Sequence, residues 1–135
     1  MADDDLLYRL IIATNTKWNG DHAARAGSNA FDDVPEDRLA ELGAPAVAVS
    51  VYIDSVMRQH GATLDDLLDR WGPKYGIAAL RVSDARECHQ GIVRDPRPEA
   101  PEHGMIFALE GPRKTRQQSR ALAKASWIAK PPPRR

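Results

Sequence analysis

Three side chains with nucleophilic or metal-binding chemistry lie in the second half of the chain. Cys88 and His89 are adjacent, and His103 follows in the next apolar segment. A structural zinc site requires four such ligands in closely spaced pairs. Adjacent residues also point to opposite faces of a strand, or diverge by roughly 100 degrees on a helix. We therefore predict no metal, no cofactor and no catalytic pair here, and we interpret Cys88 as a buried, unreactive thiol.

Paired carboxylates and glycines offer two further kinds of chemistry. Asp65 and Asp69 share one face if their segment is helical, where they either hold a hard cation or form a solvated acidic surface. The stretch Gly72–Gly76 lacks the spacing and the Ser or Thr of a phosphate-binding loop. An enzyme is therefore only a third alternative, in the form of a small hydrolase or toxin that uses His89, His103 and a carboxylate.

The distribution of charge is the strongest functional signal. The formal net charge is zero, with 19 acidic and 19 basic residues. All 19 acids lie in residues 1–111, whereas residues 112–135 contain eight bases and no acid. Such an asymmetry predicts an anionic partner for the basic end. That partner is either an external molecule or the acidic part of the chain itself.

The basic segment is predicted to form a helix from Thr115 to about Ala129. Leu122 and Ile128 belong to an apolar stripe on this helix, and the cations lie along an adjoining strip. Exposed cations of this kind can neutralise the phosphates of DNA or RNA. We predict that Trp127 is either a stacking surface or an anchor to the domain. The predicted phosphate contacts are Arg113, Lys114, Arg116, Arg120 and Lys124.

These charges lead to two hypotheses of different classes. The first is a small non-enzymatic accessory or regulatory protein that contacts nucleic acid through its basic C-terminal helix. The second is a protein-interaction or assembly component, of phage or toxin-immunity type, that docks on an acidic protein surface. Self-association into a homo-oligomer is compatible with both.

The N-terminal half of the sequence favours helices. Between Asp3 and Trp18, apolar residues recur at spacings of three and four, and three aspartates occupy the first turn. Pro35 is expected to open a short helix over residues 36–42. Residues 44–60 fit both a strand and a helical period, and their length favours a helix between Pro45 and Gly61.

The remaining elements are read from capping, turn and alternation signals. Thr63 and Asp66 resemble a capping box and predict a helix that ends at Trp71. Residues 75–89 fit either a helix or a strand, and both readings stay open. Residues 91–94 and 103–109 are predicted to pair as antiparallel strands. The prolines between them cannot join a helix or a central strand.

Composition places the chain among globular cytoplasmic proteins. Its single cysteine excludes an internal disulfide, and its acidic start differs from a signal peptide. No apolar run approaches the ~20 residues of a membrane-spanning helix, so we expect no membrane partner. The 14 arginines against 5 lysines are typical of a GC-rich coding sequence, which suggests a bacterium or a phage.

Together these observations predict one α+β domain over residues 1–130. The N-terminal two-thirds should be mainly helical, followed by a late antiparallel β-hairpin and the basic C-terminal helix. Residues 131–135 are expected to form a disordered tail of proline and arginine.

Overall fold

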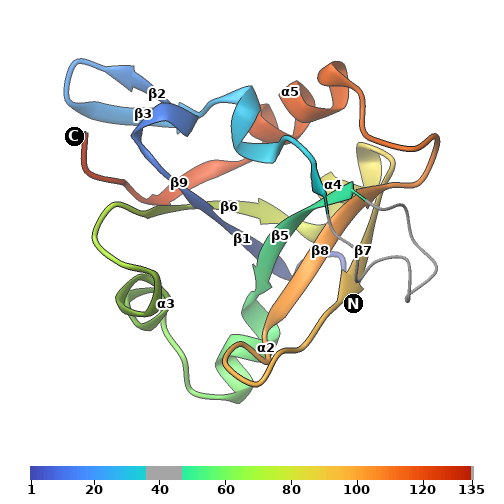
Figure 1. The fold of residues 1–135 in the computed structure, drawn as a ribbon, viewed down its shortest axis with the longest axis horizontal. Coiled ribbons are helices and arrows are strands. Elements are labelled where there is room, and N and C mark those ends of the chain that lie inside the picture. The colour runs from blue at the N-terminus through green and yellow to red at the C-terminus, as the bar shows by residue number, and fades with distance from the viewer. Residues whose placement is uncertain (36–46, 135) are drawn as a thin grey trace.

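The computed structural model describes residues 1–35 and 47–134 and is dominated by an antiparallel sheet (Figure 1). The strand order is β7-β8-β5-β1-β6-β9, and β4 also pairs with β5. A separate hairpin is formed by β2 and β3. The strands of the sheet are β1 Leu6–Ile11, β4 Val34–Pro35, β5 Val47–Ile53, β6 Gly76–Arg81, β7 Gln90–Arg94, β8 His103–Ala108 and β9 Trp127–Lys130. The hairpin strands are β2 Thr16–Asn19 and β3 His22–Ala26.

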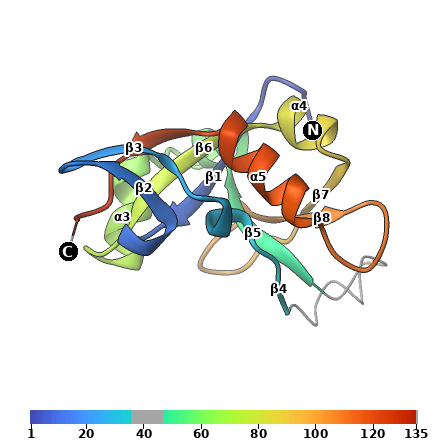
Figure 2. The ribbon, with the colours of Figure 1, turned by 90° about the horizontal axis from the view of Figure 1, so that it is seen from above.

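Short helices and the hairpin cover the two faces of this sheet. Figure 1 shows α5 and the hairpin above the sheet and α2 and α3 below it. Figure 2 views the upper layer from above, with the hairpin beside α5. The α-helices are α2 Asp54–Gln59, α3 Leu64–Trp71, α4 Val82–Glu87 and α5 Arg116–Ala125, and the 3-10 helices are η1 Ala13–Asn15 and η2 Ser28–Phe31.

Each face of the sheet has its own apolar core because alternate residues of a strand point to opposite sides. On one side, Leu7 and Val49 pack with Leu122 of α5 and with η2. On the other side, Tyr8 and Leu67 belong to the core that α3 covers. The central strands are therefore apolar on both faces. This burial explains why residues 3–18 and residues 44–60 were expected to be helical.

The prediction of a mainly helical N-terminal two-thirds is wrong, beginning with the helix expected over residues 3–18. That segment forms β1, η1 and β2 instead. Its i, i+3, i+4 apolar spacing arises because Leu7 and Ile11 face one core while Leu10 packs against the other. A strand buried on both faces gives a nearly continuous apolar run, which also satisfies a helical period.

The ambiguous segments divide between the two kinds of structure. Within residues 44–60, which we expected to be a helix, β5 occupies Val47–Ile53 and α2 occupies Asp54–Gln59. Residues 75–89 divide in the same way into β6 and α4. Each apolar strand continues directly into a helix without a glycine or proline, so no turn signal marks the change. The helix predicted over residues 36–42 lies outside the described residues.

Three local predictions are confirmed. The α3 helix begins after Thr63, whose hydroxyl accepts a hydrogen bond from the Asp66 backbone N–H and completes the capping box. The late hairpin forms between β7 and β8, with Val93 opposite Met105. The basic helix α5 also exists, although it ends at Ala125 because the following residues form β9 on the edge of the sheet.

The C-terminal residues follow β9 along the sheet. In the described part of the tail, residues 131–134, the side chain of Pro132 is buried. A Cβ atom added to Gly76 would overlap the backbone of Pro132 and Lys130, so the chain passes tightly over β6. Among the described residues, no helix has the length and apolar character to cross a bilayer.

Candidate functional site

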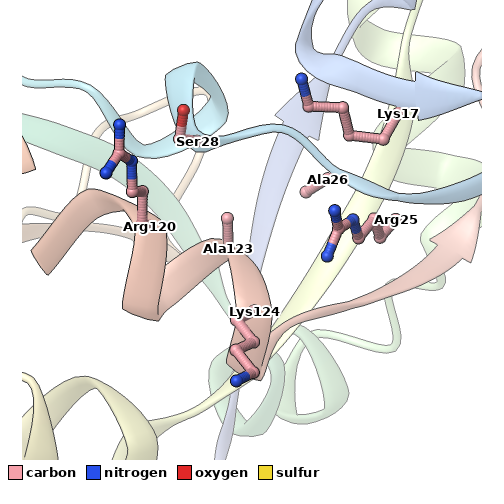
Figure 3. A pocket seen from close by; sticks show the side chains of 7 residues that line it. All are labelled: Lys17, Arg25, Ala26, Ser28, Arg120, Ala123 and Lys124. Carbon is pink, nitrogen blue, oxygen red and sulfur yellow. The ribbon is translucent and has the colours of Figure 1, made fainter. Parts of the chain in front are cut away.

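A basic hollow lies between the β2–β3 hairpin and α5 (Figure 3). Its volume is about 400 Å³. Besides four cations, the polar residue Ser28 lines it. Two cations come from the hairpin and two from the helix, so residues far apart in sequence meet here. The four cations are Lys17, Arg25, Arg120 and Lys124. We call this feature the basic hollow.

The helix presents its cations because its opposite side is fixed in the core. The Thr115 hydroxyl accepts from the Gln118 backbone N–H and caps the first turn. Leu122 and Ala123 are buried. Residues four apart lie on one helix face. The exposed side chains Arg116, Arg120 and Lys124 therefore form a continuous basic strip, about 12 Å long at 1.5 Å per residue.

The hairpin contributes two like charges in direct opposition. Lys17 of β2 pairs in register with Arg25 of β3, and both side chains are exposed. Like charges at directly opposed positions of an antiparallel pair destabilise that pair. An anion in the basic hollow would reduce this repulsion.

The four cations of the basic hollow have no ion-pair partner among the described residues. The ion pairs of residues 1–35 and 47–134 involve other cations, such as Arg86 with Asp3 and Lys130 with Asp65. Among residues 1–35 and 47–134, no acidic side chain lines the hollow. The local field is therefore positive and is available to an anion from outside.

The predicted contact Lys114 is placed differently from its basic neighbours. Its side chain is buried, and its ammonium group forms an ion pair with the Asp33 carboxylate. Its backbone N–H donates to the same carboxylate at 2.9 Å. Burial lowers the pKa of Lys114, although the Asp33 charge acts in the opposite direction. Lys114 therefore belongs to the interior of the protein and not to its basic surface.

The other predicted contacts are divided between three places. Arg120 and Lys124 line the basic hollow. Arg113 and Arg116 border a second hollow of about 300 Å³, which also contains Asp32 and Asp33 and therefore has mixed charge. The sixth predicted site residue, Trp127, lies on β9, where the Arg81 guanidinium is 5.0 Å from the centre of its ring.

Sequence reasoning missed Lys17 and Arg25. Both lie in the part of the chain with net negative charge, and the segment 19–34 has no sustained apolar period. The turn at Gly20, which has a φ of 62°, separates two short runs that pair as strands. No local signal links this hairpin to a helix near the C-terminus, because only the shared core brings them together.

The histidines and the cysteine also separate in space. Cys88 packs against the core that contains Leu122, and burial raises the pKa of its thiol. His89 is exposed next to the far end of β8, where its backbone oxygen accepts from Leu109. His103 begins β8, roughly 20 Å away at ~3.4 Å per residue. Among the described residues, no group of His, Cys, Asp and Glu side chains could hold a metal ion.

His103 has other polar partners that the sequence did not indicate. Its buried ring lies between the Asp95 carboxylate and the Ser50 hydroxyl, at 3.0 Å and 3.1 Å. Asp95 follows β7 and Ser50 lies within β5, so three separate segments supply this cluster. We call these residues the Ser50–His103–Asp95 cluster.

No protein-family model, curated protein or solved structure matches this chain.

Proposed function

We propose that this protein binds nucleic acid through the basic hollow and the basic strip of α5. The proposal rests on the convergence of four cations on one hollow, which has no acidic lining residue in the described part of the chain. These cations are Lys17, Arg25, Arg120 and Lys124. Phosphate groups are the matching ligands, because neutralising them releases condensed counterions from the nucleic acid. The protein would act as an accessory or regulatory factor and not through chemistry on the nucleic acid.

The arrangement favours contact with the phosphate backbone. Flexible lysine and forked arginine side chains bind phosphate oxygens, and such contacts carry no sequence information by themselves. Of the described residues that line the basic hollow, none is an aromatic residue on which a base could stack. We therefore expect binding with little sequence preference and a strong dependence on salt.

The test is a titration of fluorescently labelled DNA and RNA oligonucleotides of mixed sequence, in single-stranded and duplex form. The salt concentration is varied from about 50 to about 200 mM, a range over which phosphate contacts weaken strongly. The unaltered protein should bind at least one of them, with an affinity that falls steeply with salt. The triple variant Arg25→Ala, Arg120→Ala, Lys124→Ala should lose about two to three units of the slope of log affinity against log salt, since each phosphate contact contributes roughly one.

The matched control removes an exposed cation outside the basic hollow. Lys74 lies over the ring of Tyr75 and does not line the hollow. Lys74→Ala should leave both affinity and slope nearly unchanged. Equal losses of affinity and slope in the control and in the triple variant would contradict the basic hollow as the binding site. Absence of binding to every oligonucleotide at the lowest salt would contradict the function and favour an acidic protein surface as the partner.

A further inference from the structure

Three side chains from separate segments form a hydrogen-bonded chain inside the protein. The Ser50 Oγ lies 3.1 Å from Nε2 of His103, and Nδ1 of the same ring lies 3.0 Å from Oδ2 of Asp95. His103 and Asp95 are buried, whereas Ser50 is half-buried. We propose that Ser50 is a nucleophile, activated by His103, that accepts the acyl group of a carboxylic ester.

The partners of His103 determine which of its nitrogens carries the proton. Nδ1 faces two acceptors, the carboxylate and the backbone oxygen of Asp95. A neutral ring therefore places its hydrogen on Nδ1 and its lone pair on Nε2. Burial lowers the pKa of His103, with Arg97 acting in the same direction and Asp95 opposing it. The ring is neutral at neutral pH, and Nε2 can take the proton of the Ser50 hydroxyl.

Charged neighbours hold the cluster and add a positive field beside Ser50. Arg97 donates to Asp95 Oδ2 at 3.2 Å, so Asp95 is fixed from a second side. Arg9 donates to the backbone oxygen of Ser50 at 3.2 Å. Burial lowers the pKa of this guanidinium. The same guanidinium donates to the backbone oxygen of Ala30 at 2.8 Å, so its positive charge is held beside the Ser50 backbone. There it would stabilise negative charge that develops on a nearby substrate oxygen.

An aromatic row connects the cluster to the surface. The ring of Tyr52 lies edge-on to His103, with ring centres 5.7 Å apart, and lies 6.2 Å from Trp71. Trp71 is one of the exposed large apolar side chains, with 42% of its surface accessible. The charges of Arg70 and Glu102 nearby are paired with each other. These surroundings fit an uncharged ester with an apolar acyl group.

The proposed reaction is a balanced acyl transfer. The Ser50 oxygen bonds to the ester carbonyl carbon while its proton moves to Nε2 of His103. The carbonyl electron pair moves to oxygen, then returns as the alcohol leaves with the proton from Nε2. Water, deprotonated by the same nitrogen, attacks the carbonyl carbon of the acyl–Ser50 ester. The Ser50 oxygen then leaves with the proton from Nε2, and a carboxylic acid is released. Asp95 acts as a positioning residue through its bond to Nδ1.

The test uses an alkyl fluorophosphonate, which forms a bond between phosphorus and an activated serine oxygen as fluoride leaves. Peptide mapping by mass spectrometry of the folded protein should place the label on Ser50. Ser50→Ala should abolish labelling, and His103→Gln should slow it by about 100-fold or more. Ser55→Ala is the matched control, because Ser55 is half-buried like Ser50. The Ser55 hydroxyl donates its hydrogen bond to the Asp5 carboxylate and not to a histidine.

Two further measurements separate catalysis from a structural role. The labelling rate should rise with pH through the lowered pKa of His103 and be flat above pH 7, and Asp95→Asn should move that midpoint to lower pH. This follows because Asp95 opposes the lowering effect of Arg97. The proposal fails if the folded protein reacts no faster than the urea-unfolded chain, or if the label lies on another residue. This comparison uses only the unaltered protein, so its outcome does not depend on whether any variant folds.

Discussion

The ammonium group of Lys114 is paired with the carboxylate of Asp33 inside the protein, although 81 positions separate the two residues in sequence. The pair ties the segment before α5 to the segment after η2. It also removes one cation from the basic surface and so limits the binding face to the exposed cations around it.

Removing one partner of this pair should strongly destabilise the protein. In Lys114→Met the Asp33 carboxylate remains buried without its counter-ion, so the free energy of unfolding should fall by about 3 kcal/mol. Urea denaturation measures this change. The exposed neighbour Arg113 provides the control, because Arg113→Met should change stability by no more than about 0.5 kcal/mol. If Lys114→Met loses as little stability as the control, the buried ion pair between Lys114 and Asp33 is contradicted.

The opposed cations of the hairpin should weaken folding while they support binding. In Arg25→Gln the repulsion with Lys17 is lost, so the free energy of unfolding should rise by roughly 0.2 to 0.5 kcal/mol. The same variant should bind oligonucleotides more weakly. Added salt should stabilise the unaltered protein more than the variant, since salt screens this repulsion. Thermal unfolding at two salt concentrations measures both effects, and a destabilised variant would contradict the argument.

His103 should make the protein less stable in acid. Because the folded protein lowers the pKa of His103 from its ordinary 6.5, the unfolded chain binds a proton more readily. This contribution to stability is complete above pH 6.5 and is lost as the pH falls towards the folded value. The slope should reach at most about 1.4 kcal/mol per pH unit.

The variant His103→Gln should lose this part of the pH dependence. Denaturation midpoints between pH 7.5 and pH 5.5 measure the effect (a range of about one unit to each side of the ordinary histidine value). The exposed His22 provides the matched control, His22→Gln. If His103→Gln retains the full slope, the titrating group lies elsewhere.

Two glycines should differ in the cost of an added methyl group. At Gly76 a Cβ meets the backbone of Lys130 and Pro132, whereas at Gly91 it meets the ring of Phe107. A ring can turn aside more easily than a neighbouring strand can move. Gly76→Ala should therefore cost about 1 to 3 kcal/mol and expose the amides of β9 to hydrogen exchange. Gly91→Ala should cost less and leave β9 protected, and the reverse order would contradict this packing.

Three elements could be predicted from the sequence because their signals are local. Thr63 with Asp66, and the proline-rich connector between two apolar runs, act within a few residues of where they stand. The basic character of α5 follows from composition alone. The capping interaction of Thr115 lies within the first turn of that helix. Such features hardly depend on the rest of the fold.

The N-terminal half could not be predicted in this way. Local periodicity cannot distinguish a helix with one apolar face from a strand buried on both faces, and β1 and β5 are strands of the second kind. The choice is made by sheet pairing between distant segments, such as β1 with β6 and β5 with β8.

By itself, the sequence determined the excess of positive charge at the C-terminal end and the helix that carries it, since both depend on residue type and on contacts within one or two turns. Only the tertiary structure decided which cations are exposed. It buried Lys114 against Asp33, and it brought Lys17 and Arg25 to the same hollow as Arg120 and Lys124. The physical reason is that burial and charge pairing depend on distances through space, which packing of the whole chain sets.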